Sequence, residues 1–361
     1  MTEHVKVATR ELEEFVKSVL QRSGLSEEDA RISAEVLLYA DRRCIESHGV
    51  ARLERYVIEL KTGGILPRAE MRVVHETPVS LVVDGGGGMG QPIGYRTMQR
   101  CIEKARTNMI CLASVRNSNH YGIAGYYTLM ALSENMIGIS MTNSAPLVVP
   151  THARDAIIGT NPISMGVPAG REQPFLLDMA TATVPRGTLE VKARHNQSMP
   201  DCWATDEEGL PSTDAARVLD NLKNRRGGGL LPLGGGTEET GGHKGFGLGV
   251  AVEILCGVLS SGEVATDVYG RKNQPSGVAH FLGAINPAAF VGLDEIRENM
   301  DHLLGLLKSS PKAAGQTRIF VAGEKEYDCQ DCTREKLPLE RNVFDTLNRV
   351  GEPFGLRLSE I

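Results

Sequence analysis

The sequence has no apolar run that is long enough to cross a membrane. None of its 361 residues belongs to a stretch that approaches the roughly 20 apolar residues needed to span a bilayer. The N-terminus is charged from Glu3 onward and lacks the apolar segment of a secretory signal peptide. We therefore expect a cytoplasmic protein with no membrane partner.

Long blocks of lysine and arginine are also missing. The net charge is -6, so we expect no nucleic-acid partner, because such a partner requires a basic surface. Hydrophobic residues make up 41% and charged residues 23% of the chain, as in an ordinary globular protein. The length exceeds the size at which one core usually keeps growing, which favours two domains.

Cysteine is present in an odd number, seven, and mostly in apolar surroundings. This pattern predicts reduced thiols in the cytosol and argues against a disulfide framework. Cys329 and Cys332 form one CxxC pair, but a zinc ribbon requires a second pair, which the sequence lacks. We expect no metal site, and we interpret the CxxC pair as reduced surface thiols.

Residue periodicity predicts both helices and strands. Apolar residues recur at helical spacing over 9–22 and again after Ser26, where Asp29 completes a capping box. From Val73 the pattern changes. The expected strands are 79–84, 109–115, 136–141 and 174–178, and the expected helices are 92–107, 245–259 and a helical tail from about 292.

These elements predict an α/β protein with two domains. A mixed α/β domain of residues 73–291 would be inserted in a mainly helical domain made of residues 1–72 and 292–361. Residues 224–242 contain eight glycines and have the composition of a mobile loop. Two interpretations of this loop stay open, namely a flexible connector and a flap over a cofactor.

Residues 47–52 (SHGVAR) place polar side chains at the start of an expected amphipathic helix that ends at Gly63. His48 and Arg52 are four positions apart, so both would lie on one helical face. A guanidinium binds a carboxylate through two parallel hydrogen bonds, and an imidazole beside it can exchange a proton with the carbonyl oxygen of a 2-oxo acid. Ser47 would hydrogen-bond the ring or the substrate. The alternative is that His48 caps the helix and Arg52 is a solvated surface residue.

Gly85, Gly87 and Gly90 match the GxGxxG spacing of a dinucleotide-binding turn directly after a strand. The match is weak, because five of these six residues are glycine. A Rossmann site would also need an acidic residue at the end of the next strand, where Arg116 stands instead. Arg116 would suit a 2′-phosphate, so dinucleotide binding and a plain glycine-rich turn both remain open.

Four further segments combine polar residues with turns. They are 118–122 (SNHYG) after a strand, 159–162 (GTNP) in a turn, 177–182 (LDMATA) at a strand end, and 242–245 (GHKG) at a helix start. Backbone N–H groups and Lys244 at that helix start could hold a phosphate. Each segment alone is ordinary, and a single histidine such as His120 is more often structural than catalytic.

Together and in this order, these segments resemble the malate/L-lactate dehydrogenase family, which also includes ureidoglycolate, sulfolactate and diketogulonate oxidoreductases and cyclic-imine reductases. The segments that carry the resemblance are 40–41, 47–53, 118–122, 159–162, 178–180 and 242–248. The resemblance implies a nucleotide-binding domain that is not of the Rossmann type, and a homodimer whose active site lies near the subunit interface. It also implies that the glycines at 85–90 form a structural turn.

The resemblance implies hydride transfer between a nicotinamide and a small 2-hydroxy or 2-oxo acid. His48 would be the acid/base residue with Ser47 as its orienting partner, and Arg52 would bind the substrate carboxylate. His120 is a second candidate for the base. The residues implied to contact the cofactor are His120, Tyr121, Gly122, Ile123, Ala124, Thr160, Asp178, Met179, Ala180, Arg186 and Gly187, with Lys244 at its phosphate. We expect NAD, with NADP as the alternative.

Malate and oxaloacetate are the expected substrates, and malate needs a second cationic or polar group for its distal carboxylate, such as Arg186 or Arg194. Lactate, sulfolactate and ureidoglycolate are alternatives within the family. A non-redox carboxylate-binding protein or a hydro-lyase is the alternative from another class. Three positions depart from the family pattern, namely Cys44 in place of glycine, Glu46 in place of aspartate and Ala322 in place of proline.

Overall fold

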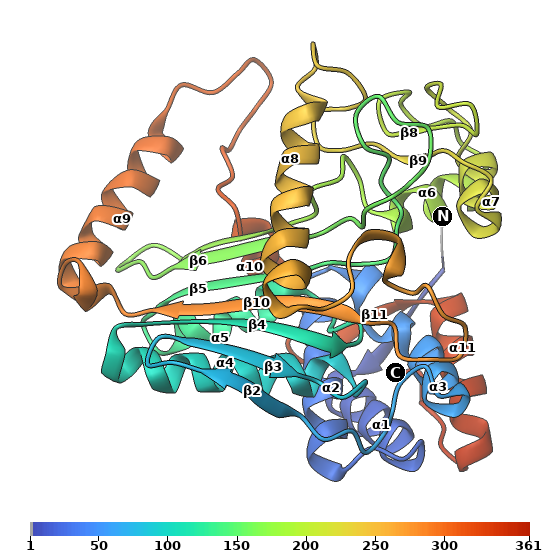
Figure 1. The fold of residues 1–361 in the computed structure, drawn as a ribbon, viewed down its shortest axis with the longest axis horizontal. Coiled ribbons are helices and arrows are strands. Elements are labelled where there is room, and N and C mark those ends of the chain that lie inside the picture. Colours follow the sequence, from blue (N-terminus) through green and yellow to red (C-terminus); the bar gives the residue numbers. More distant parts are fainter. Residues whose placement is uncertain (1–2) are drawn as a thin grey trace.

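The computed structural model describes residues 3–361, and a mixed seven-stranded sheet lies at its centre (Figure 1). The strand order is β2-β3-β4-β10-β5-β6-β7. The strands are β2 (Arg72–Glu76), β3 (Ser80–Asp84), β4 (Ile110–Ser118), β5 (Ile137–Thr142), β6 (Ile163–Val167), β7 (Phe175–Met179) and β10 (Val278–Ile285). β3 and β4 pair in parallel, and the other neighbouring pairs are antiparallel. The predicted α/β class with a mixed domain not of the Rossmann type is confirmed.

The expected strands 79–84, 109–115, 136–141 and 174–178 correspond to β3, β4, β5 and β7. The central strand β10 is not predicted by the sequence. Its residues VAHFLGAI are buried on both faces along nearly the whole strand. They therefore lack the alternation that marks a half-buried strand, and a short apolar run of this kind also fits a helix.

Two helices cover one face of the sheet (Figure 1). They are α4 (Gly90–Asn108) and α5 (Ala124–Ser133). Residues 119–123, which form part of the site, connect β4 to the second of these helices. Met98 of α4 and Tyr127 of α5 pack with Leu81 of β3 in one buried apolar cluster. Helix α4 confirms the expected helix 92–107.

The other face of the sheet is covered in part by α8 (Gly242–Glu253), which continues into a π-helical turn, Ile254–Val258. Cys256 of that turn packs against Phe281 of β10 in a separate apolar cluster. These two elements correspond to the expected helix 245–259. Among the helices of residues 3–361, none combines the length and the apolar character that a membrane span requires.

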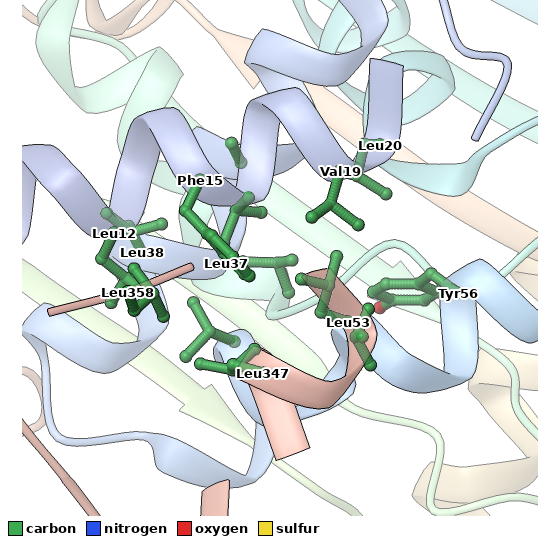
Figure 2. Packing of buried hydrophobic residues seen from close by; sticks show 14 of the residues in the cluster. Leu12, Phe15, Val19, Leu20, Leu37, Leu38, Leu53, Tyr56, Leu347 and Leu358 are labelled. Carbon is green, nitrogen blue, oxygen red and sulfur yellow. The ribbon is translucent and has the colours of Figure 1, made fainter. Parts of the chain in front are cut away.

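The two ends of the chain fold together beside the sheet. The elements of this terminal unit are β1 (His4–Ala8), α1 (Thr9–Arg22), α2 (Glu27–Arg42), α3 (Leu53–Thr62), β11 (Lys336–Glu340) and α11 (Arg341–Gly351). β1 pairs with β11 in an antiparallel ladder. Figure 2 shows how Leu12, Leu37, Leu53 and Leu347 from four of these helices meet in one core. The predicted helix 9–22 is confirmed.

The helix expected after Ser26 is also confirmed. It is α2, and the side chain of Ser26 accepts a hydrogen bond from the Asp29 N–H at 3.1 Å. This contact satisfies one of the backbone donors that every helix leaves without an internal partner at its N-terminus. The cap fixes where α2 begins, and α2 then runs to the segment that carries the candidate catalytic residues.

The remaining helices and strands lie outside the central sheet and the terminal unit. They are α6 (Arg186–Arg194), β8 (Ala204–Thr205), α7 (Ala215–Asn224), β9 (Gly229–Leu230), α9 (Leu293–Ser309) and α10 (Glu324–Cys332). The glycine-rich segment 224–242 contains β9, which pairs with β8. Helix α9 lies apart from the terminal unit (Figure 1). Its Asp301 side chain accepts hydrogen bonds from the backbone N–H groups of Gly170 and Arg171. The division into domains 1–72 with 292–361 and 73–291 stays a prediction.

Candidate active site

A cavity of about 480 Å³ lies where the terminal unit meets the sheet. The predicted site residues that line it are Ser47, His48, Arg52, His120, Tyr121, Gly122, Thr160, Arg186 and Gly187. We call this space the site cavity. Residues from far-apart parts of the chain therefore meet in one place that is large enough for a small ligand.

Residues 47–52 do not open an α-helix, and this prediction is wrong. The chain forms two 3₁₀ turns, Glu46–His48 and Val50–Arg52, and helix α3 begins only at Leu53. The cause is Asp41, whose buried carboxylate accepts the Val50 N–H at 2.7 Å. This contact draws the chain toward α2 at residue 49, where the backbone is extended.

Glycine is required at position 49 for the same reason. A Cβ atom on Gly49 would lie 1.9 Å from the Asp41 Oδ1 atom. The argument that His48 and Arg52 share a helical face therefore fails, but both side chains still line the site cavity. The Nε–H of Arg52 donates to the Ser47 carbonyl at 2.6 Å, which leaves the two Nη groups for a ligand.

His48 is held by its neighbour in the sequence. The Ser47 Oγ atom lies 2.9 Å from His48 Nδ1, and a hydroxyl can either donate to or accept from that nitrogen. Burial lowers the pKa of His48 to about 4, and the positive charges of Arg52 and Arg55 act in the same direction. His48 is therefore neutral at pH 7 and can accept a proton.

His120 lies opposite His48, with the two rings stacked at a centroid distance of 5.6 Å. Its Nδ1 atom lies 2.6 Å from the Tyr56 hydroxyl, and it accepts the Gly122 N–H at 3.3 Å. Burial lowers the pKa of His120, and the nearby Arg55 adds to the effect. Both histidines are therefore uncharged in a cavity that also holds arginines.

A second cavity of about 260 Å³ lies beside the first turn of α5. Among its lining residues are Arg43, Ile123, Gly125 and Asp178, together with residues 320–323. We call it the side cavity. The segment that carries Tyr121 and Gly122 to the site cavity continues into Ile123 at the side cavity, so the two spaces adjoin one short stretch of chain.

Asp178 meets the N-terminus of α5. Its Oδ2 atom accepts the Gly125 N–H at 2.7 Å, a favourable place for a carboxylate because helix N-termini carry partial positive charge. The side chain still reaches solvent through the side cavity, yet protein surrounds it, and this burial raises its pKa to about 7. Asp178 can therefore accept hydrogen bonds from a polar ligand in the side cavity.

Residues 7–348 match the pattern of the malate/L-lactate dehydrogenase family. The chain belongs to this family. A malate dehydrogenase of Pyrococcus abyssi is 45% identical over 360 residues, which cover 99% of this chain and 97% of that protein. An L-sulfolactate dehydrogenase of Methanocaldococcus jannaschii is 35% identical over 348 residues, or 96% of each chain. The solved structure of malate dehydrogenase from Pyrococcus horikoshii OT3 is similar with a TM-score of 0.89, at 41% identity and 99% coverage of both chains.

Family membership makes the chain a hydroxyacid dehydrogenase and implies a nicotinamide cofactor. The predicted dehydrogenase is confirmed, and the alternative of a non-redox binding protein or a hydro-lyase is excluded. Dehydrogenases of this kind leave the hydride chemistry to the cofactor, while the protein binds and orients the reactants. The site cavity and the side cavity are the two spaces in which this protein could bind and orient its reactants.

Some residues implied to contact the cofactor do not line either cavity. Ala124 is buried in the first turn of α5, and Ala180 packs against the apolar cluster beside α6. Met179 is half-buried at the end of β7, and Lys244 is exposed in the first turn of α8. The structure therefore brings Asp178 to a cavity but not its two successors, and it leaves Lys244 on the surface.

Several lining residues escaped the sequence analysis. They are Arg55, Asn143, Ser144, Glu190 and Tyr269. Arg55 donates from Nη2 to the Tyr269 hydroxyl at 2.6 Å. Arg55 follows Arg52 by three residues and could have been found from that spacing. Tyr269 lies in a loop and carries no local signal.

The glycines at 85–90 form a structural turn between β3 and α4. The N–H groups of Gly85 and Gly87 donate to the backbone carbonyls of Arg116 and Asn117. A Cβ atom on Gly90 would lie 2.2 Å from the Asn119 carbonyl oxygen, so the start of α4 is packed against protein. The Arg116 guanidinium forms an ion pair with the Asp84 carboxylate at 3.0 Å. This pairing argues against Arg116 as a ligand of a 2′-phosphate.

Cysteine chemistry differs from the prediction. Cys44 and Cys329 form a disulfide with a Cα–Cα distance of 6.1 Å, so the expectation of reduced thiols is wrong for these two residues. The sequence could not show this, because the partners are 285 positions apart and meet only when α10 folds beside the end of α2. Cys332 is an exposed free thiol. Within residues 3–361, no cluster of His, Cys, Asp or Glu side chains suits a metal ion.

Proposed function

We propose that this dehydrogenase interconverts malate and oxaloacetate in the site cavity. The observation that carries the proposal is the meeting of three arginines and two neutral histidines in a cavity sized for a small acid. The relatives named malate dehydrogenase, at 45% identity for one protein and 41% for one solved structure, support this substrate. Lactate, sulfolactate and ureidoglycolate are the alternative substrates.

Arg52 binds the carboxylate next to the reacting carbon. Its Nε–H is held by the Ser47 carbonyl, so the plane of the guanidinium is fixed before the substrate arrives. A planar guanidinium can grip a carboxylate through two parallel bonds, which an ammonium cannot reproduce. This contact places the reacting carbon, and such positioning can supply several kcal/mol of the barrier.

His48 exchanges the proton, with Ser47 as its orienting partner. In the oxidation direction, neutral His48 takes the proton of the substrate hydroxyl, and the hydride leaves the carbon that bears this hydroxyl. In the reduction direction, protonated His48 returns the proton to the carbonyl oxygen. When bound, the nicotinamide supplies or accepts the hydride. His120 is the second choice for the acid/base role.

The second carboxylate of malate requires another cation. Arg186 lines the site cavity and pairs with Glu190 at 3.0 Å. Arg194 instead lines a neighbouring cavity and pairs with Glu340 at 3.0 Å. We therefore favour Arg186 over Arg194 as the partner of the distal carboxylate.

The cofactor would lie along the segment that joins the two cavities. Its proposed contacts that line a cavity are His120, Tyr121, Gly122, Ile123, Thr160, Asp178, Arg186 and Gly187. Ala124, Met179 and Ala180, with Lys244 at a phosphate, are proposed contacts outside the two cavities. The side cavity fits a polar group, because Asp178 is held at a helix N-terminus with its carboxylate accessible.

We favour NAD over NADP. Asp178 and Glu326 both line the side cavity, and a carboxylate binds ribose hydroxyls but repels a 2′-phosphate. Arg43 and Lys325, which line the same cavity, are the groups that a 2′-phosphate would use. Titration of the protein with NADH and with NADPH, followed by nicotinamide fluorescence, tests this preference, and tighter binding of NADPH would contradict it.

We also propose a homodimer. Helix α8 and its π-helical turn expose Leu248, Ile254 and Val258, with 43%, 50% and 59% of each residue accessible. Exposed apolar side chains on one helical segment are typical of an interface. Light scattering should give twice the mass of the chain, and Ile254→Glu should give a monomer.

The cytoplasmic location stays a proposal, and the Cys44–Cys329 disulfide removes reduced thiols as an argument for it.

The activity itself is tested with a panel of 2-oxo acids. Each acid is mixed with NADH or NADPH, and the absorbance of the reduced nicotinamide is followed. Oxaloacetate with NADH should give the largest kcat/KM, and another acid in first place would overturn the proposed substrate.

A further inference from the structure

The two contacts of His120 fix where its ring proton lies. A backbone N–H can only donate a hydrogen bond, so the contact from Gly122 at 3.3 Å requires a bare Nδ1 atom that accepts. The Tyr56 hydroxyl, 2.6 Å from the same nitrogen, must then donate as well. In the neutral ring, the proton therefore lies on Nε2.

Burial, together with nearby positive charge, keeps this ring neutral. The groups that face it and can titrate or carry charge are His48, Arg52, Arg55, Tyr56 and His280. Burial and the arginines lower the pKa of His120. Burial raises the pKa of Tyr56, so its hydroxyl keeps the proton that it donates.

Tyr56 is itself held firmly. Its ring is completely buried, and Figure 2 shows it beside Leu53 at the edge of the core of the terminal unit. His120 belongs to the loop after β4 of the sheet. The hydrogen bond between Tyr56 and His120 therefore joins the terminal unit to the sheet across the site. Tyr56 lies in α3, the helix that begins directly after Arg52.

We propose that Tyr56 is a positioning residue that holds His120 as a neutral Nε2–H donor, which polarises the substrate oxygen while His48 transfers the proton. This inference rests on the proposed function. During oxidation, the hydroxyl proton passes to His48 and the hydride to the cofactor, and His120 keeps its own proton throughout. A neutral imidazole that polarises a carbonyl is a known device of enzymes.

The ring proton can be observed directly. Two-bond ¹H–¹⁵N correlation spectra of the protein labelled with [¹⁵N]histidine, with His120 assigned through His120→Gln, report which nitrogen is protonated. At pH 7 the wild-type ring should be neutral and protonated on Nε2. Tyr56→Phe should show a measurable Nδ1–H fraction. A charged ring or an Nδ1–H ring in the wild type overturns the proposal.

Kinetics gives the second readout. Deleting a well-placed donor typically costs about 10²–10³ in turnover, and Tyr56→Phe only loosens the donor, so kcat should fall about tenfold with KM nearly unchanged. The kcat/KM profile should also gain an ionisation on the acidic side, because His120 no longer has both donors on Nδ1.

Tyr126→Phe is the matched control. It removes another buried hydroxyl, which donates to Glu35 at 2.8 Å, and it should leave kcat and the pH profile unchanged. Equal behaviour of the two variants overturns the proposal. The spectra need no substrate or cofactor, so they decide it even where Tyr56→Phe does not fold or where the His48 role fails.

Discussion

The two histidines of the site cavity are held in different ways. His48 stands in a 3₁₀ turn, and its partner is the hydroxyl of the adjacent Ser47, at 2.9 Å. His120 is held by a backbone N–H and by the Tyr56 hydroxyl from another part of the molecule. A hydroxyl can reverse its hydrogen bond, whereas a backbone N–H cannot. The comparison indicates one ring that can exchange a proton and one that keeps it.

Electrostatics alone does not separate the two rings. Burial lowers the pKa of both, and Arg52 and Arg55 act on both in the same direction. An anionic substrate beside Arg52 would offset part of that positive charge and ease protonation of His48. The hydrogen-bond partners, and not the pKa direction, therefore assign the roles.

Replacing His48 should have the largest effect. We expect His48→Ala to lower kcat by about 10²–10⁴-fold, the usual contribution of a general acid or base. The pH profile gives a second measure. Because the neutral ring is the base, kcat/KM for oxidation in the wild type should rise as pH increases through about 4 and then stay level toward neutrality. His152→Ala, at an exposed histidine, is the control, and near-normal turnover of His48→Ala would contradict the role.

Replacing His120 should have the next largest effect and should differ in kind. We expect His120→Ala to lower kcat by about 10²–10³-fold, as for loss of one donor to the reacting oxygen. His120→Gln offers an amide N–H and should recover part of the loss, while both variants keep the acidic limb that belongs to His48. Glutamine that performs no better than alanine would show that His120 does not act as a neutral donor.

Local sequence signals identified the segment of His48 but not its conformation. The spacing of apolar residues correctly predicts α3, and it fails over 47–52 because the Asp41 carboxylate takes the Val50 N–H. That contact is between residues nine positions apart on different elements. Helical periodicity describes one face of one element and carries no information about such a partner.

Contacts between distant residues account for the rest of what was missed. Tyr56 and His120 are 64 positions apart, and the Cys44–Cys329 disulfide joins residues 285 apart. Their meeting depends on how the terminal unit packs on the sheet. The resemblance to a known family named nine of the residues that line the site cavity, because a family pattern reflects packing between distant segments that local periodicity does not show.

Changing Arg52 should affect binding more than chemistry. We expect Arg52→Lys to raise KM for the acid about tenfold, or roughly 1.4 kcal/mol, because an ammonium cannot form the two parallel bonds. The same change should leave kcat closer to the wild-type value than either histidine variant does. Arg72→Lys, at an exposed arginine paired with Glu70, is the control. An unchanged KM for Arg52→Lys would exclude Arg52 as the carboxylate ligand.

Breaking the disulfide should have the smallest effect on turnover and should separate the two sides of the site. Cys44 lies three residues before Ser47, so its bond to Cys329 of α10 tethers the His48 side but not the loop of His120. We expect Cys44→Ser to lower stability by about 2–4 kcal/mol and to change kcat less than threefold. Amide hydrogen exchange should become faster over 43–52 and stay unchanged over 118–125, with Cys332→Ser as the control at an exposed free thiol. Equal acceleration on both sides would mean that the two histidines are held as one unit, and the contrast between them would then be lost.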